Sequence, residues 1–228
     1  FIIKRELGSG AYASVYMVQP VDESGETYAL KVQKPFGCLA MEYLILRRLQ
    51  KRLGNETFIP RPLALHMFSD GGLLSMSMPK GQPHAFHGKN VLDLVNAHLV
   101  HGGGPVPELV AIWYTAKMLK FIEKLHTKGK VLHCDVKPDN WILCPGSVNY
   151  NEDGEGEEMI SGASLQLIDF GRAIDMEDCG LSKTTKFTGD AAGEDMKCVG
   201  MKEKRAWSYD TDTFGVCASS HVLLFGTH

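Results

Sequence analysis

A short run of the chain, His133 to Asn140, carries side chains whose types and spacing suit the transfer of a charged group to a hydroxyl. Asp135 can orient an attacking hydroxyl and accept its proton, and Lys137 can neutralise charge on a transferred phosphoryl group. Asn140, on the far side of the turn, can bind a metal ion. His133 is expected to brace the loop backbone rather than to react. A plain polar turn before a strand is the alternative, and the residues downstream argue against it.

The downstream run Leu167 to Gly171 reads Leu-Ile-Asp-Phe-Gly and places the carboxylate of Asp169 at the end of a short apolar strand. An Asp-Phe-Gly sequence in this position is typical of a magnesium site that serves the phosphates of ATP. Asp169 is therefore expected to hold Mg²⁺ bridging the β- and γ-phosphates. The motif is weak alone and gains weight from the motifs that precede it in order.

A glycine pair, Gly8 and Gly10, separates two strand-like runs and is followed by Val15. Glycines in such a hairpin let the backbone approach a polyphosphate and offer it N–H groups. Most glycine pairs in tight turns bind nothing, and Ala13 stands where a G-x-G-x-x-G motif has its third glycine. We expect Gly8, Gly10 and Val15 to contact ATP because the other motifs follow.

Lys31 lies in a mainly apolar strand, Tyr-Ala-Leu-Lys-Val, where a lysine is most often a surface residue. The alternative is a lysine that faces a cleft, is held by a carboxylate and contacts the α- and β-phosphates of ATP. Glu42, on the next helix, is the candidate carboxylate. Ala29, Ser77 and Met78 are expected to line the adenine site, although Ser77 and Met78 could equally belong to a plain core strand.

The periodicity of apolar residues predicts the elements that must position these groups. Strand-like runs cover 2–7, 13–18, 27–32, 62–68 and 73–78, and an amphipathic helix covers 38–53. Further along, helices are expected at 91–100, 109–125 and 213–225, with a short buried strand at 165–168. We therefore expect an α+β, bilobal protein-kinase fold: a β-rich lobe over 1–80, a mainly helical lobe over 81–228, and ATP in the cleft between them.

The composition argues against several other classes of protein. A net charge of −3 gives no field that favours nucleic acid, and no apolar run is long enough to span a membrane. The six cysteines include no C-x-x-C pair, so reduced thiols in an intracellular protein are expected rather than a zinc site or disulfides. The acidic, glycine-containing segment 145–164 predicts a solvated loop insertion, with an acidic docking site as the alternative.

Beyond these motifs, the C-terminal third resembles the Bub family of mitotic spindle-checkpoint kinases. The resemblance rests on the runs Asp169–Met176, Lys186–Gly189, Cys198–Met201, Lys204–Val216 and Leu224–Gly226, and the run His133–Leu143 is also similar. It implies a nuclear, kinetochore-associated serine/threonine kinase that uses ATP and Mg²⁺. It also implies protein substrates, among them a histone tail, and checkpoint proteins as partners.

Departures from the common kinase pattern stand out at three places. Cys134 replaces the arginine of H-R-D, as it is also replaced in Bub kinases, so ordering of the activation loop by a phosphate is not expected. Gly200 stands where a glutamate that pairs with an arginine is expected. The chain begins in a strand and ends at His228, before the last helices of the helical lobe, which indicates a fragment or an incomplete lobe.

Three functions remain open on the sequence alone. An active protein kinase is favoured because Lys31, Glu42, Asp135, Asn140 and Asp169 are all present, and a scaffold under no catalytic demand need not keep them. A catalytically silent pseudokinase scaffold of the same checkpoint is the alternative. A small-molecule phosphotransferase of related fold is the third, but such enzymes usually lack the Lys-Pro pair of the loop.

Overall fold

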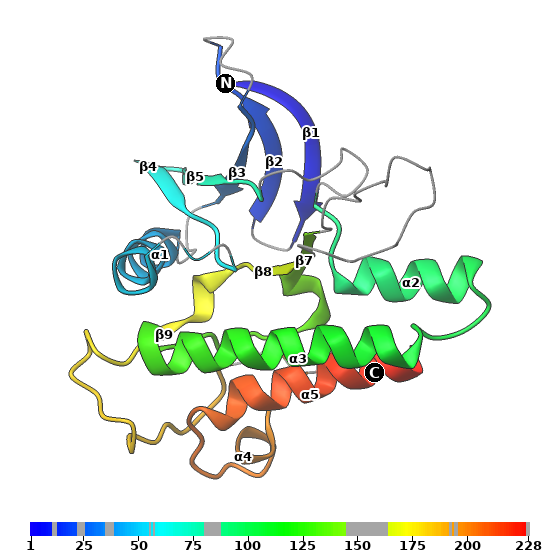
Figure 1. Ribbon diagram of the computed structural model, residues 1–228. Coiled ribbons are helices and arrows are strands. Elements are labelled where there is room, and N and C mark those ends of the chain that lie inside the picture. The colour runs from blue at the N-terminus through cyan, green and yellow to red at the C-terminus, as the bar shows by residue number, and fades with distance from the viewer. Residues whose placement is uncertain are drawn as a thin grey trace.

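A computed structural model describes residues 1–10, 13–21, 26–34, 39–54, 56, 58–79, 88–144, 164–191, 193 and 196–226. The expected lobe boundary at residue 80, the acidic insertion up to residue 163 and Cys38 lie outside these ranges. Within them, no helix is both long and apolar enough to cross a membrane, and the cysteines are free thiols. Figure 1 shows a sheet with one helix above a mainly helical region, so the expected α+β, two-lobed fold is confirmed.

The N-terminal lobe is built on a five-stranded antiparallel sheet in the order β1-β2-β3-β5-β4. Its strands are β1 (Ile2–Ser9), β2 (Ala13–Gln19), β3 (Tyr28–Gln33), β4 (Pro62–Phe68) and β5 (Gly71–Ser77). Each lies where the sequence predicted a strand, with small shifts at the ends. Because side chains alternate between the two faces of a strand, β3 sends Ala29 and Lys31 to one face and Leu30 and Val32 to the other.

Helix α1 (Leu39–Leu53) connects β3 to β4, and it follows the amphipathic pattern of its sequence. Its buried residues recur every three or four positions: Leu39, Glu42, Ile45, Leu46 and Leu49. Glu42 is the one carboxylate in this buried stripe. The basic side chains of the last turn lie at the negative end of the helix dipole, which favours them there.

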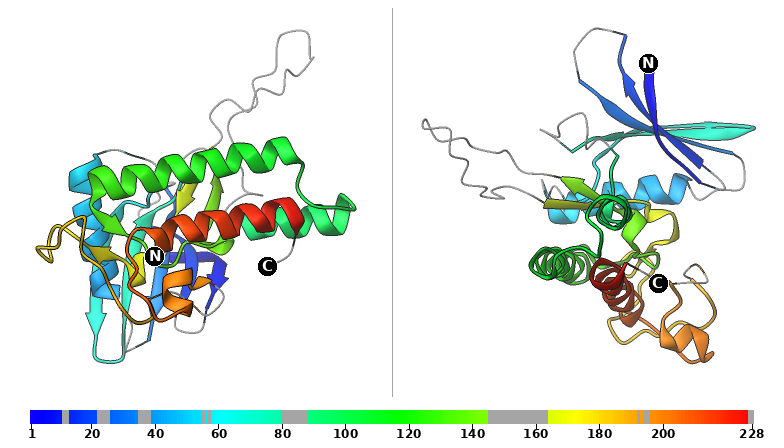
Figure 2. Two further views of the ribbon diagram at one scale, coloured as in Figure 1. Left: turned by 90° about the horizontal axis from the view of Figure 1, so that it is seen from below. Right: turned by 90° about the vertical axis from the view of Figure 1, so that its right-hand side faces the viewer.

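The C-terminal lobe is organised around α2 (Val91–His101), α3 (Glu108–Lys124) and α5 (Asp210–Phe225). Figures 1 and 2 show α3 and α5 side by side along their lengths, and Thr115 Oγ1 donates to Ser220 Oγ at 2.8 Å between them. α2 begins with a capping box between Asn90 and Asp93. α3 runs into a π-helical turn, Leu125–Gly129, that leads to the next strand.

The start of α5 differs from the prediction, which placed it at Thr213. The helix begins at Asp210 instead. Its first turn is polar, so a search for apolar periodicity does not detect this turn. Aspartates in a first turn interact favourably with the helix dipole. One of them, Asp212, is fully buried, and its role becomes clear in the active site.

Two short antiparallel strand pairs hold the loops that contain the candidate catalytic and metal-binding residues. β6 (Val131–Leu132) pairs with β9 (Ile174–Asp175), and β7 (Trp141–Cys144) pairs with β8 (Ser164–Leu167). The loop 133–140 joins β6 to β7, and Asp169 lies in the connection from β8 to β9. The largest apolar cluster extends through both lobes and includes Leu46, Leu74, Phe121 and Phe170. The site therefore stands on a continuous core.

Candidate active site

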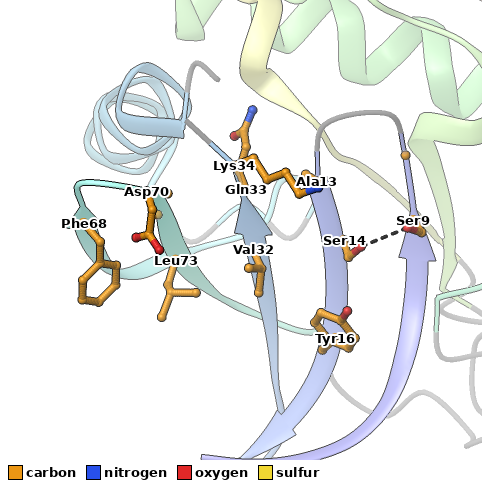
Figure 3. Close-up of a pocket in the computed structure, with 13 residues that line it drawn as sticks. Ser9, Ala13, Ser14, Tyr16, Val32, Gln33, Lys34, Phe68, Asp70 and Leu73 are labelled. Atoms are coloured by element: carbon orange, nitrogen blue, oxygen red, sulfur yellow. Dashed lines mark hydrogen bonds between the residues drawn. The ribbon is translucent and has the colours of Figure 1, made fainter. Parts of the chain in front are cut away.

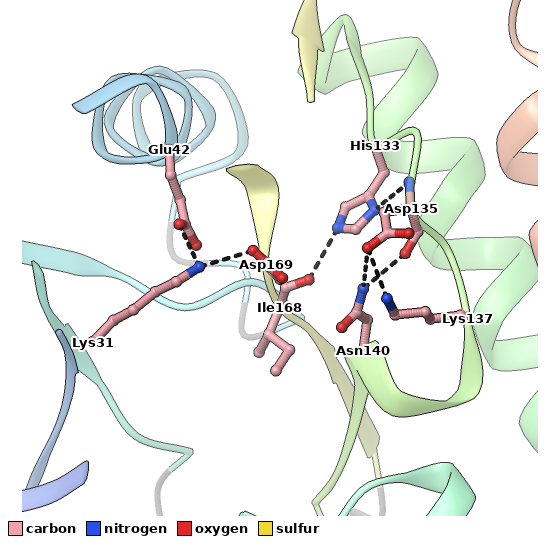
Figure 4. A network of polar contacts seen from close by, with 8 residues as sticks. All are labelled: Lys31, Glu42, His133, Asp135, Lys137, Asn140, Ile168 and Asp169. Atoms are coloured by element: carbon pink, nitrogen blue, oxygen red, sulfur yellow. Dashed lines mark hydrogen bonds and ion pairs between the residues drawn. The ribbon is translucent and has the colours of Figure 1, made fainter. Parts of the chain in front are cut away.

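Lys31, Glu42 and Asp169 meet in one ion-pair cluster, supplied by β3, α1 and the turn after β8 (Figure 4). Lys31 Nζ lies 2.7 Å from Glu42 Oε2 and 2.8 Å from Asp169 Oδ1. Lys31 is only 8% exposed, so the alternative of a surface lysine is wrong. A Cβ at Gly171 would lie 3.4 Å from Asp169 Oδ1, and the glycine therefore leaves room for the cluster.

Burial and charge act in opposite directions on these groups. For Lys31, burial would lower the pKa, but the carboxylates of Glu42 and Asp169 outweigh it and raise the pKa. Burial raises the pKa of Glu42 despite the attraction of Lys31. For Asp169, burial would raise the pKa, but Lys31 outweighs it and the pKa is lowered. The lysine is therefore held in its charged form, with Asp169 as its ionised partner.

Three of the residues expected to contact ATP, namely Val15, Ala29 and Lys31, lie on one face of the sheet. Val15 pairs directly with Lys31 across β2 and β3, and Ala29 lies two residues before Lys31 on the same face. Gly8 pairs with Val15 near the end of the β1–β2 hairpin. Gly10 follows in the turn itself, where its N–H makes a backbone hydrogen bond of 2.8 Å.

Ser77 and Met78 stand at the end of β5, and the hydroxyl of Ser77 already has a structural partner. Ser77 Oγ accepts from the N–H of Arg61 at 3.0 Å, and the N–H of Ser77 donates to the carbonyl of Arg61 at 2.8 Å. The serine thus ties β5 to the start of β4. Contact of Ser77 and Met78 with adenine stays a prediction.

Asp135, Lys137 and Asn140 converge in the loop between β6 and β7 (Figure 4). Lys137 Nζ donates to Asp135 Oδ2 at 3.0 Å, and Asn140 Nδ2 donates to the same oxygen at 3.2 Å. Asn140 Nδ2 also donates to the backbone carbonyl of Asp135 at 2.8 Å. Asp135 Oδ1 is buried and has no hydrogen-bond partner among the described residues. The carboxylate is therefore fixed through one oxygen and keeps the other as an acceptor.

His133 is fully buried and braces this loop, as the sequence predicted. Its Nε2 lies 3.0 Å from the carbonyl oxygen of Ile168, and its Nδ1 accepts from the N–H of Asp135 at 3.3 Å. These contacts assign the ring proton to Nε2, because Nδ1 is the acceptor. Burial lowers the pKa of His133. The imidazole is therefore neutral, and it joins the strand end before Asp169 to the catalytic loop.

Asp212, in the first turn of α5, anchors the loop and was not identified as a site residue from the sequence. Its Oδ2 accepts from the N–H of His133 and from His126 Nε2, and its Oδ1 accepts from the N–H of Cys134, each at 2.8 Å. Burial would raise the pKa of Asp212, but these donors outweigh it and the pKa is lowered. The sequence signal that could have identified Asp212 is an acidic residue at the start of an apolar helix. Such a residue can become buried, and a buried charge requires partners.

Two backbone features let α5 approach the loop this closely. Cys134 has a φ of 65°, a left-handed conformation that non-glycine residues rarely adopt and that is common at functional sites. It lets two successive N–H groups reach the carboxylate of Asp212. Gly215 lies one turn further along α5, where a Cβ would lie only 2.3 Å from the carbonyl oxygen of Val136. A side chain at this position would displace the loop.

The segment after Asp-Phe-Gly is held by an apolar cluster of its own. The cluster contains Leu132, Cys134, Met176, Met196, Cys198, Met201 and Trp207, and the Trp207 indole donates to the carbonyl of Gly189 at 2.7 Å. Cys134, where many kinases have an arginine, is therefore an apolar packing residue. The segment also contains a short helix, α4 (Val199–Lys202), in a stretch where apolar periodicity predicted no element.

Gly200 in α4 shows why no glutamate occupies this position. A Cβ at Gly200 would lie 3.2 Å from both the carbonyl oxygen of Ala206 and Trp207 Cβ. The N–H of Arg205 donates to the carbonyl of Gly200 at 2.7 Å. The chain thus folds back tightly over α4, and close backbone packing stands where an ion pair was expected.

A hollow of about 520 Å³ lies on the opposite face of the sheet and is not the site of this chemistry (Figure 3). Tyr16, Val32 and Leu73 line it, together with the end of the glycine hairpin. Val32 follows Lys31 directly, so its side chain points to the other face of β3. The hollow is therefore separated from the ion-pair cluster by the sheet itself.

Asp169 and Asn140 offer oxygen atoms that suit Mg²⁺. The Asp169 side chain is 44% exposed, and both hydrogen bonds of Asn140 use its Nδ2, which leaves its Oδ1. In the described part of the chain, no three His, Cys, Asp or Glu side chains form a metal cage. Mg²⁺ is usually bound by one or two carboxylates together with substrate phosphates, so this donor set fits the ion.

Comparison with known proteins agrees with this arrangement, although no family model matches the chain. The spindle assembly checkpoint serine/threonine-protein kinase BUB1 of Saccharomyces cerevisiae is 33% identical over 99% of this chain and 22% of that protein. The mitotic checkpoint serine/threonine-protein kinase BUB1 of Arabidopsis thaliana is 32% identical over 97% of this chain and 40% of that protein. The chain thus spans less than half the length of either relative.

A solved structure supports the same conclusion at the level of the fold. The crystal structure of the BubR1 kinase domain matches with a TM-score of 0.78 and 26% identity, covering 99% of this chain and 62% of that one. The chain therefore has a protein-kinase fold. It is homologous over nearly its whole length to the Bub1 checkpoint kinases, so the resemblance to the Bub family is confirmed.

Proposed function

We propose that the chain transfers the γ-phosphoryl group of ATP to a serine or threonine hydroxyl of a protein substrate. The observation that carries this proposal is the state of Asp135. One oxygen of its carboxylate is fixed by Lys137 and Asn140, while Oδ1 is buried without a partner among the described residues. A buried acceptor without a partner costs free energy. A substrate hydroxyl would satisfy it.

Each group has a role in the proposed transfer. Asp135 Oδ1 accepts the hydrogen bond of the substrate hydroxyl, orients it and takes its proton. Lys137, held beside that carboxylate, neutralises charge on the transferred group. Lys31, fixed by Glu42, contacts the α- and β-phosphates. Asp169 and Asn140 would hold Mg²⁺, which supplies positive charge to the phosphates when bound.

The glycine hairpin supports the nucleotide part of the proposal. Among the described residues, a Cβ at Gly8 would meet no atom within 4 Å, and one at Gly10 would approach only the Ala13 carbonyl, at 3.8 Å. Packing against the described part of the chain therefore requires glycine at neither position. A phosphate group that approaches the backbone would require it.

The sharpest test compares Asp135→Asn with Asp139→Asn in the protein that contains this chain. Both variants remove one negative charge from the same loop, but Asp139 has no assigned role. Asp135→Asn is expected to lower transfer from Mg²⁺-ATP to a histone-tail peptide by about 10²- to 10⁴-fold while nucleotide binding survives. Asp139→Asn should transfer at nearly the parental rate.

Two results would contradict the proposal in different ways. If Asp135→Asn transferred phosphate as well as the parent protein, the role assigned to Asp135 would be wrong. If the parent protein bound ATP but transferred no phosphoryl group, the hypothesis of a catalytically silent pseudokinase scaffold would be correct.

We further propose that the protein acts in the mitotic spindle checkpoint, in the nucleus and at kinetochores, with checkpoint proteins as partners. The support is the homology to relatives named as spindle assembly or mitotic checkpoint kinases. A fluorescently tagged full-length protein should gather at unattached kinetochores in mitosis. Uniform distribution through mitosis would contradict this assignment.

A further inference from the structure

The C-terminal half of α1 carries a second set of ion pairs, separate from the Lys31–Glu42 pair. Arg48 and Arg52 lie one helical turn apart, so they share one side of the helix. That side faces a short acidic run at and after the end of β9, formed by Asp175, Glu177 and Asp178. We call these five residues the α1 clamp.

Arg52 reaches the C-terminal lobe through both backbone and side-chain contacts. Its Nη1 donates to the carbonyl of Gly129 at 2.8 Å and lies 3.0 Å from Asp175 Oδ1. Its Nε lies 2.8 Å from Glu177 Oε2. The side chains of Arg52 and Asp175 are 17% and 3% exposed, so this ion pair is better shielded from water than a surface pair, whereas Glu177 is 63% exposed.

Asp175 gives the clamp a rigid base. Its side chain is 3% exposed, and its Oδ1 accepts from the N–H groups of Glu177 and Asp178 at 3.1 and 3.0 Å. These hydrogen bonds fix the turn in which the three carboxylates lie. Arg48 Nη1 lies 3.8 Å from Asp175 Oδ2, and Arg48 also pairs with Asp178. Both arginines therefore bind a preformed turn.

The clamp and the ion-pair cluster attach the two halves of α1 to one segment of the chain. In its first half, Glu42 accepts from Lys31 Nζ at 2.7 Å, and Lys31 Nζ also donates at 2.8 Å to Asp169, at the start of that segment. In its second half, Arg48 and Arg52 bind the residues from Asp175 onward. Both halves of α1 are thus tied to one segment. Rotation of the helix away from Lys31 would break the contacts of Glu42, those of the α1 clamp, or both.

We infer that Arg48 and Arg52 are positioning residues that hold α1 where Glu42 reaches Lys31, an inference that rests on the proposed phosphoryl transfer. The carboxylates of the acidic turn supply, within the unmodified chain, the negative charge that a phosphorylated loop would otherwise have to provide. Neither arginine touches the reacting groups. Their effect is transmitted through the placement of α1.

The test compares Arg52→Gln with Arg47→Gln in the full-length protein. Both variants remove one positive charge from α1, but Arg47 is exposed and lies outside the clamp. Arg52→Gln is expected to lower kcat/KM for ATP roughly 5- to 30-fold and to speed hydrogen exchange of the α1 amides around Glu42. Arg47→Gln should change neither. Equal effects of the two variants on exchange would overturn the inference.

Exchanging the two charges of the Arg48–Asp178 pair distinguishes loss of this ion pair from general damage to the fold. Arg48→Glu alone should speed exchange in α1, and the double variant Arg48→Glu/Asp178→Lys should restore part of the protection. A double variant that exchanges as fast as the single one would also overturn the inference. Hydrogen exchange needs no turnover, so if the parent transfers no phosphate, the proposed function fails while the clamp is still tested.

Discussion

The molecule holds its two groups of candidate site residues by different physical means. The cluster of Lys31, Glu42 and Asp169 joins elements of both lobes through long charged side chains. The catalytic loop is held instead by successive backbone N–H groups that donate to the fully buried carboxylate of Asp212. The first arrangement depends on how the lobes are placed, and the second depends only on the fold of the C-terminal lobe.

Because of this difference, the ion-pair cluster and the Asp212 network should contribute differently to the free energy of unfolding. Ion pairs can often be replaced by apolar side chains of similar size with little change in the free energy of unfolding. Backbone N–H groups cannot be replaced, so removal of their buried acceptor leaves them unpaired. The two networks should therefore respond oppositely to substitution.

The largest effect on stability is expected at Asp212. Asp212→Asn replaces one acceptor oxygen with a donor that faces donors, and should lower the free energy of unfolding by roughly 3–5 kcal/mol. Asp210→Asn, in the same helical turn but exposed, is the matched control. Urea unfolding of both variants measures the difference. Equal midpoints would show that Asp212 does not anchor the loop.

The second effect is a dependence of the free energy of unfolding on pH, caused by the titration of His133. Burial lowers the pKa of His133 from its ordinary value of 6.5, so below about pH 6.5 the unfolded chain binds a proton that the folded protein does not. Stability should therefore fall as the pH is lowered, by at most about 1.4 kcal/mol per pH unit. The lowered pKa of Asp212 contributes its own loss only near and below its ordinary value of 3.8.

The measurement is urea unfolding of the parent and of His133→Gln between pH 7.5 and 5. The variant will be less stable overall but should show a flatter pH dependence, because the titrating group is gone. Parallel curves for the two proteins would rule out His133 as the source of the slope.

Substitutions in the ion-pair cluster should have the smallest effect on the free energy of unfolding and the largest effect on phosphoryl transfer. Lys31→Met/Glu42→Leu should unfold within about 1 kcal/mol of the parent, because an apolar pair replaces a buried ion pair. Phosphoryl transfer should be lost. The single variant Lys31→Met leaves Glu42 buried without its partner and should be less stable than the double variant. A strongly destabilised double variant would erase the contrast between the two networks.

The sequence predicted the parts of the molecule whose pattern is local. Strands and helices followed from apolar periodicity, and the spacing of Asp135, Lys137 and Asn140 within one loop determined their convergence. The meeting of Lys31 with Glu42 and Asp169 is not local, since 138 positions separate the lysine from the aspartate. It was predicted only because the motifs occur in a familiar order.

The residues that sequence analysis missed act through long-range contacts with the backbone. The acid at the start of α5 indicates that Asp212 needs partners, but the sequence does not show that these are N–H groups of residues 78 and 79 positions away. Arg48 and Arg52 were not identified as site residues from the sequence, and the side chain of Arg52 is only 17% exposed. Charged side chains on a helix reveal their partners only once the tertiary fold is known.

The close approach at Gly215 has a consequence for motion. With 2.3 Å between a hypothetical Cβ and the Val136 carbonyl, α5 and the segment around Asp135 leave no space between them. Most of residues 133–140 have no regular secondary structure, yet they should fluctuate on the nanosecond timescale like the middle of a helix. Backbone order parameters near 0.85 are expected there, as in rigid elements. If Asp135 accepts a proton as proposed, so stiff a support would keep its carboxylate in nearly the same position from one turnover to the next.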